Sequence, residues 1–100
     1  MTPEKKVKTK VVAILKELGA YYFYPITGGY GASGVPDIVG CYKGRFFAIE
    51  CKGTSKGKTT ALQDKNIAQI IAQGGAAIVV NEDNIPDVDK LMIEIDMGER

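Results

Sequence analysis

Two apolar segments, residues 37–42 and 45–52, flank the dipeptide Lys43-Gly44, and they constrain the fold more than any other feature of the sequence. Lys43-Gly44 suits a tight turn, so the two segments are predicted to form a β-hairpin. Side chains alternate between the faces of a strand, and here both faces are mostly apolar. The hairpin is therefore expected to lie inside a sheet that is covered on both sides.

The polar residues of this hairpin gather at its open end. Pairing Tyr42 with Arg45 across the turn sets Asp37 opposite Glu50 on one face, and Lys52 shares that face. A four-residue loop keeps this register, whereas a three-residue loop shifts it by one. Two opposed carboxylates repel each other unless a cation lies between them, and paired carboxylates are ligands that Mg²⁺ prefers.

The rest of the chain supplies the other elements of one small α/β domain, expected to span residues 1–100. Helical periodicity, capping residues and apolar runs predict the order αβββαβα. The predicted elements besides the hairpin are a helix at 3–18, a strand at 20–26, a helix at 60–73, a buried strand at 76–80 and a helix at 85–95. The first helix has an inward stripe of Val7, Val11, Ile14, Leu15 and Leu18, which Glu4 is expected to extend.

Composition excludes several kinds of site. The chain has no histidine, which removes Ser-His-Asp catalysis and histidine metal ligands. The hairpin register places Cys41 and Cys51 on opposite faces, so they are predicted to be free core thiols. The net charge is only +1, although lysines cluster near residues 5–10 and 52–58. Without a transmembrane-length apolar run or a signal peptide, the protein is expected to be cytoplasmic and to bind no membrane.

Simpler interpretations of the polar residues exist. Asp37 can be part of a turn, and Glu50 with Lys52 can be a solvated edge pair. The stretch GTSKGKT after an apolar strand resembles a phosphate-binding loop. However, Gly53 and Gly57 enclose only three residues, and Lys52 stands where that signature requires glycine. Convergence of two acids and a lysine in an apolar hairpin favours a functional site.

The segments Gly34-Val35-Pro36-Asp37 and Ile49-Glu50-Cys51-Lys52, with Gln63 and the glycines after it, resemble the VRR-Nuc family of the PD-(D/E)XK nuclease superfamily. The resemblance runs from Glu4 to about Val80. It implies a restriction-endonuclease-like core with a central mixed β-sheet flanked by helices. It also implies a metal-dependent endonuclease that uses Mg²⁺, with Mn²⁺ as a substitute.

The resemblance assigns roles to individual residues. Asp37, Glu50 and the backbone carbonyl of Cys51 would bind the metal, and Lys52 would be the catalytic lysine. Gln63 would be a helix residue near the site, although it also fits a helix-capping role. Glu4 matches an acid that contacts the metal or its waters in related enzymes, although it also suits the positive end of a helix dipole.

Small members of this family look like homodimeric, structure-specific nucleases that act on branched DNA, including four-way (Holliday) junctions. Two loops flank the site, and DNA contacts are predicted in them for Tyr30, Ser33, Lys56 and Lys58. The alternatives are a non-catalytic DNA-binding module of the same fold and a nuclease directed at RNA.

Overall fold

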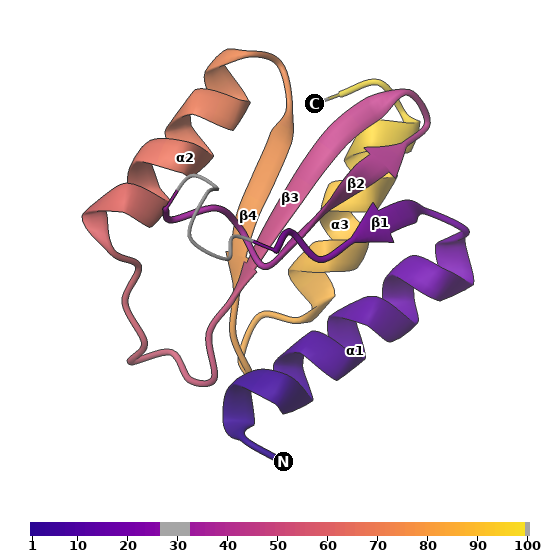
Figure 1. Ribbon diagram of the computed structural model, residues 1–100. Coiled ribbons are helices and arrows are strands. Elements are labelled where there is room, and N and C mark those ends of the chain that lie inside the picture. Colours follow the sequence, from indigo (N-terminus) through magenta and orange to yellow (C-terminus); the bar gives the residue numbers. More distant parts are fainter. Residues whose placement is uncertain (27–32, 100) are drawn as a thin grey trace.

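The computed structural model describes residues 1–26 and 33–99, and within them the elements follow the predicted order (Figure 1). They are α1 (Pro3–Leu18), β1 (Tyr21–Phe23), β2 (Ile38–Tyr42), β3 (Arg45–Cys51), α2 (Ala61–Ala72), β4 (Ala76–Val80) and α3 (Pro86–Asp96). None of the described helices is both long and apolar enough to cross a membrane.

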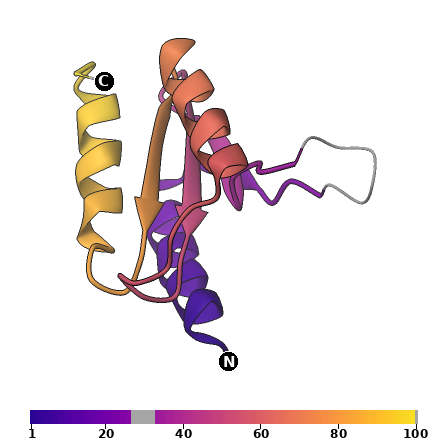
Figure 2. The same ribbon diagram turned by 90° about the vertical axis from the view of Figure 1, so that its left-hand side faces the viewer.

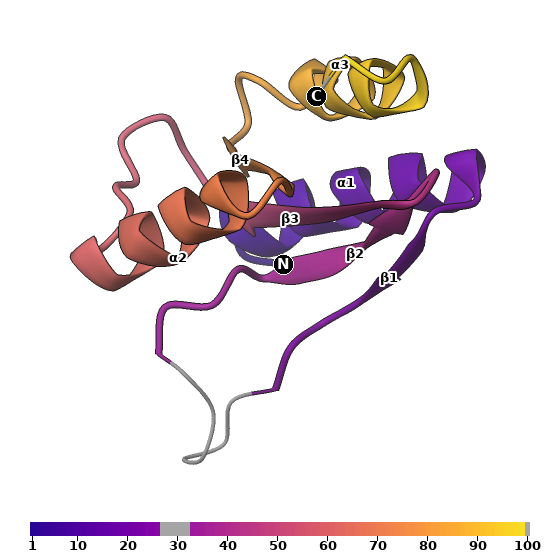
Figure 3. The same ribbon diagram turned by 90° about the horizontal axis from the view of Figure 1, so that it is seen from above.

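The strands form a mixed sheet in the order β1-β2-β3-β4. The first three strands are antiparallel neighbours, whereas β3 and β4 run parallel and are connected through α2. A parallel pair requires such a crossover, because a tight turn cannot return the chain to the same end of the sheet. Helices α1 and α3 lie on one face of the sheet and α2 on the other (Figures 2 and 3). The predicted fold class is therefore confirmed.

Each face of the hairpin has its own apolar cluster, which explains why both faces are apolar in sequence. Ile38, Phe47 and Ile49 pack with α1 and α3 in the larger cluster. Val39 and Ala48 belong to the smaller one, against the α2 side. Burial of each large apolar side chain stabilises the folded state by about 1.5–3 kcal/mol. The central hairpin therefore holds the helices on both faces of the sheet in place.

The helix ends follow their sequence signals. The Thr2 side chain accepts a hydrogen bond from the Lys5 amide at the start of α1, and Gly19 ends that helix in a left-handed conformation. Thr60 and Gln63 form the predicted capping box at the start of α2. These local contacts explain why the helix boundaries are predictable to within a residue or two.

Four expectations about exposure or length are wrong. Strand β1 covers only Tyr21–Phe23, shorter than the predicted 20–26. Glu4 and Leu18 are exposed because the buried stripe of α1 is confined to its middle. Cys41 is also exposed, because it lies beyond the part of the sheet that α2 covers, whereas Cys51 is buried as predicted.

Gly40 allows β1 to approach the hairpin closely. A Cβ atom there would lie 1.9 Å from the Tyr21 carbonyl oxygen and 2.7 Å from the Phe47 ring. Gly44 is different: its Cβ would meet no atom within 4 Å, but its φ of +81° disfavours other residues.

We expect Gly40→Ala to lower the free energy of unfolding by about 3 kcal/mol or more, because backbone and a buried ring would both have to move. Gly44→Ala is the matched control and should cost only about 1 kcal/mol, from backbone strain alone. Urea denaturation of the two variants measures both values. Equal losses would contradict the steric role of Gly40.

Candidate active site

The hairpin has the predicted register, which brings the acidic residues to one end of the sheet. Tyr42 pairs with Arg45, and the pairing continues to Ile38 opposite Ile49. Asp37 directly precedes β2, and Glu50 lies one residue beyond Ile49 in β3. The sheet therefore delivers Asp37 and Glu50 to the same place.

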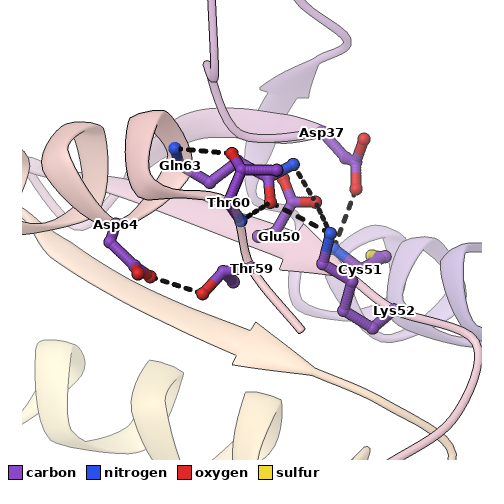
Figure 4. Close-up of polar contacts among 8 residues, drawn as sticks. All are labelled: Asp37, Glu50, Cys51, Lys52, Thr59, Thr60, Gln63 and Asp64. Atoms are coloured by element: carbon purple, nitrogen blue, oxygen red, sulfur yellow. Dashed lines mark hydrogen bonds and ion pairs between the residues drawn. The ribbon is translucent and has the colours of Figure 1, made fainter. Parts of the chain in front are cut away.

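A backbone contact that the sequence did not reveal orients Asp37. Its Oδ2 accepts a hydrogen bond of 2.8 Å from the amide of Cys51 (Figure 4). Asp37 is half-buried. One carboxylate oxygen is thus held by β3, and the side chain is directed toward the strand that carries Glu50.

The loop before Asp37 is fitted against α2. Gly34 has a φ of +78°, and a Cβ atom there would lie 2.6 Å from the carbonyl carbon of Leu62. The carbonyl of Ser33 accepts a hydrogen bond of 3.1 Å from the Asn66 side chain. Glycine is required at this position of the Gly34-Val35-Pro36-Asp37 segment, since a larger residue would clash with Leu62 and push the loop before Asp37 away from α2.

Glu50, Lys52 and Gln63 form a connected polar network (Figure 4). Lys52 Nζ lies 3.4 Å from Glu50 Oε2 and donates a 3.0 Å hydrogen bond to Gln63 Oε1. The Gln63 amide nitrogen donates a 3.1 Å bond to the same Glu50 oxygen. The acid, the lysine and the amide, which come from β3, the loop after it and α2, therefore hold one another in place.

Gln63 fills both roles that its sequence position suggested. Its side-chain Oε1 accepts a 2.9 Å hydrogen bond from the Thr60 backbone amide, and its backbone amide donates a 3.1 Å bond to Thr60 Oγ1. The capping box fixes the side chain at the first turn of α2, and that position also reaches Glu50 and Lys52. The two interpretations are therefore compatible.

Glu50 is buried, with only 3% of its side chain exposed. Burial raises its pKa from 4.5 to about 7; the charge of Asp37 also raises it, and Lys52 opposes the shift. Among the described residues, none gives Glu50 Oε1 a hydrogen-bond partner. An unpaired buried carboxylate oxygen is costly. Its position beside a second carboxylate is the setting in which a divalent cation restores the missing interaction.

The donor set suits Mg²⁺. Asp37 and Glu50 offer carboxylate oxygens, the ligands that this hard cation takes, while water completes its shell. The thiol of Cys51 is unsuited, because burial raises its pKa to about 12, with the Asp37 charge adding to the effect. The Cys51 carbonyl stays a predicted ligand.

Glu4 is not part of the carboxylate pair. It lies in the first turn of α1, close to Gly53, where a Cβ atom would be 3.0 Å from the Glu4 amide nitrogen. Its side chain is exposed, and within residues 1–26 and 33–99 no three acidic, cysteine or histidine side chains gather as a metal cluster. A contact through metal-bound water stays a prediction for Glu4.

The predicted DNA contacts lie around the site. Lys56 and Lys58 are exposed on the loop between β3 and α2, where the Lys56 amide donates to Thr54 Oγ1 in a tight turn. Ser33 is exposed in the loop that precedes Asp37. Tyr30 lies outside the described residues.

Sequence patterns missed two supporting contacts. Thr59 bonds the Asp64 side chain, which ties the basic loop to the first turn of α2. The Cys51 amide that holds Asp37 was also missed, although Cys51 lies just beyond the β2–β3 pairing, which ends at Ile49, and this position was a usable signal. The Asp37 contact requires the path of the chain in space, because its partner lies 14 residues away in another element, whereas the Thr59 contact spans only five residues.

Comparison with known proteins supports the fold. No family model matches the sequence, and no curated protein matches it significantly. Among solved structures, one described as "VRR_NUC domain" has a TM-score of 0.76 at 23% identity, over 93% of this chain and 97% of that chain. The likeness in fold to this family, first indicated by short motifs, is thus confirmed across nearly the whole length of both chains.

The raised pKa of Glu50 predicts how stability changes with pH. Because the folded state holds the Glu50 proton up to about pH 7 and the unfolded state only to about pH 4.5, stability should fall as the pH rises between these values. A shift of this size corresponds to roughly 3 kcal/mol at most. In metal-free buffer, Glu50→Gln should therefore be more stable than wild type at pH 8 and similar to it at pH 4.5.

Denaturation curves at several pH values test this difference. Glu82→Gln, a change at an exposed acid on the loop after β4, is the control and should follow wild type throughout. A pH-independent difference between Glu50→Gln and wild type would contradict the prediction.

Proposed function

We propose that this chain is a metal-dependent endonuclease of the VRR-Nuc family that hydrolyses phosphodiester bonds in DNA. The observation that carries the proposal is Glu50: a buried carboxylate with one unpartnered oxygen, beside a second acid and a lysine. A protein without a functional need for this arrangement would gain stability from an apolar residue there. The shared fold with a VRR_NUC domain supports the same function.

Asp37 and Glu50 would hold the cation, Mg²⁺ or Mn²⁺. When bound, the cation supplies Lewis-acid polarisation of a phosphate oxygen and a water of lowered pKa. The carboxylates keep a fixed orientation, because the Cys51 amide holds Asp37 and the Gln63 amide holds Glu50. A site fixed before substrate arrives needs little reorganisation during the reaction.

Lys52 would act on the phosphate that is being cleaved. Its Nζ is held by Glu50 and Gln63, and its side chain keeps 15% exposure. Water attack on phosphorus builds negative charge on the phosphate oxygens, which a positioned ammonium stabilises. Gln63 contacts two site residues and is a positioning residue for them.

The contacts at α2 disfavour the phosphate-loop alternative. In nucleotide-binding loops the free amides at a helix start bind phosphate. Here Thr60 and Gln63 side chains already occupy amides at the start of α2. The lysines before that helix are therefore more suitable for the backbone of a nucleic acid.

We further propose branched DNA, including four-way junctions, as the substrate, cleaved by a homodimer. Lys56 and Lys58 would contact phosphates, which position DNA without reading its sequence. A second protomer would enlarge the small DNA-binding surface and bring a second site to the other strand. Sedimentation at micromolar concentration should give a dimer mass, and a monomer would contradict this part of the proposal.

Cleavage assays test the enzymatic part. Wild type should cut labelled four-way junctions with Mg²⁺ or Mn²⁺, and more slowly cut duplex and single strands. Lys52→Ala and Asp37→Ala should each lose about 100-fold or more in rate, because each removes a preorganised charge. Lys65→Ala, an exposed lysine of α2, is the matched control and should retain activity.

The binding-module alternative has a separate outcome. If wild type binds DNA tightly without metal and cuts no substrate, the nuclease proposal is wrong.

Millimolar Mg²⁺ should also raise the melting temperature of wild type but not of Asp37→Ala, which measures metal binding independently of activity.

The salt dependence of DNA binding tests the loop lysines. Lys56→Ala/Lys58→Ala should weaken binding and reduce the slope of log K against log [salt] by about two, because each phosphate contact contributes about 0.9. Lys90→Ala, an exposed lysine on α3, should leave the slope unchanged. An unchanged slope in the double variant would refute a phosphate role for these lysines.

A further inference from the structure

An exposed aromatic patch lies on the same face of the sheet as α2. The strand register places Tyr21, Cys41 and Phe46 in one row across β1, β2 and β3. Tyr21 is 69% exposed and Phe46 45% exposed, and Cys41 is exposed between them. Phe23 follows on the same face of β1 and is 49% exposed. Contiguous exposed apolar side chains of this kind mark interaction sites.

A groove of about 280 Å³ lies between Phe46, at one end of this patch, and α2. Phe46 and Ile70 provide apolar surface in it, and three side-chain amides, of Asn66, Gln69 and Gln73, line it from the helix. Helix spacing puts these amides on one face of α2. The six lining residues, which also include Gly75, carry no charge. The groove is therefore unsuited to a phosphate but offers hydrogen bonds beside an aromatic ring.

Strand β3 and helix α2 each contribute residues to both the groove and the candidate active site. Phe46 and Glu50 lie four residues apart on the same face of β3, a separation of about 13 Å along a strand. On α2, Gln63 holds the site residues, and Asn66 lines the groove one turn later. A strand with its phosphate at Glu50 can therefore reach the groove with a nearby nucleotide.

We propose that this groove and the aromatic patch bind an unpaired nucleobase of the strand that is cleaved. The base would stack on Phe46, and its edge would pair with the amides of α2. Single-stranded nucleic acid is commonly recognised by aromatic stacking together with hydrogen bonds to exposed base edges, both of which a duplex hides. A base left unpaired at a branch point near the scissile bond then becomes part of substrate selection. This inference rests on the proposed nuclease function for its biological meaning.

Cys41 provides a probe of the aromatic patch next to Phe46, which lines the groove. It pairs with Phe46 across the strands, which places the two Cβ atoms about 5 Å apart. The other cysteine, Cys51, is buried and cannot compete for an alkylating reagent. Without metal, a saturating ten-nucleotide single strand should slow alkylation of Cys41 about tenfold, in line with the strength of base–aromatic stacking. The same strand made of abasic sites, at the same concentration, should give little protection.

Substitutions at Phe46 separate stacking from simple coverage. Phe46→Leu keeps an apolar side chain and should abolish the difference between normal and abasic strands, whereas Phe46→Tyr keeps the ring and should retain it. Ile93→Ala removes an exposed apolar side chain from α3, on the opposite face of the sheet, and should behave as wild type.

Two outcomes overturn the inference. Equal protection by normal and abasic strands would assign the contact to phosphates. Protection that grows with protein concentration in the absence of DNA would assign the patch to a second copy of the chain. Because alkylation is measured without metal, its result is independent of cleavage: a wild type that cuts no DNA would reject the proposed function, and base-dependent protection would still identify the groove.

Discussion

The hydrogen bond between Gln63 and Glu50 is the interaction on which the rest of the site depends. It links the first turn of α2 to the end of β3. The same glutamine caps the helix and accepts a hydrogen bond from the Lys52 side chain. Without it, a buried carboxylate would face Asp37 with fewer compensating contacts, and the position of α2 over the sheet would lose a polar anchor. One side chain thus couples the placement of a helix to the chemistry of a site.

The burial of Glu50 beside Asp37 lowers the stability of the fold but suits the proposed metal site. Burial and a neighbouring acid raise the pKa of Glu50, so the ionised form that would hold a cation is disfavoured until that cation is present. A fold of 100 residues has a small core. The two apolar clusters on the faces of the hairpin provide the stability that allows a buried acid beside a second acid to persist.

The sheet face that carries Glu50 also carries the exposed aromatic row. The two ends of this face therefore offer different chemical groups to a bound molecule. At one end of the face, charged groups suit the phosphate backbone, and toward the other end aromatic and amide groups suit bases. Helix α2 borders both regions. A short helix over one part of the sheet therefore leaves the surface that a nucleic acid would need.

The sequence by itself determined the element order, the hairpin register and the convergence of Asp37, Glu50 and Lys52, because alternation, turn residues and helix caps are local signals. It overestimated the length of β1. It also predicted an inward-facing Glu4 and a buried Cys41, which are both exposed, because exposure depends on which elements cover a residue. Only the tertiary structure decided that the Cys51 amide holds Asp37, that Gly34 fits against Leu62, and that an amide-lined groove adjoins Phe46. These contacts join residues far apart in the chain, and no local pattern specifies the packing angle that brings them together.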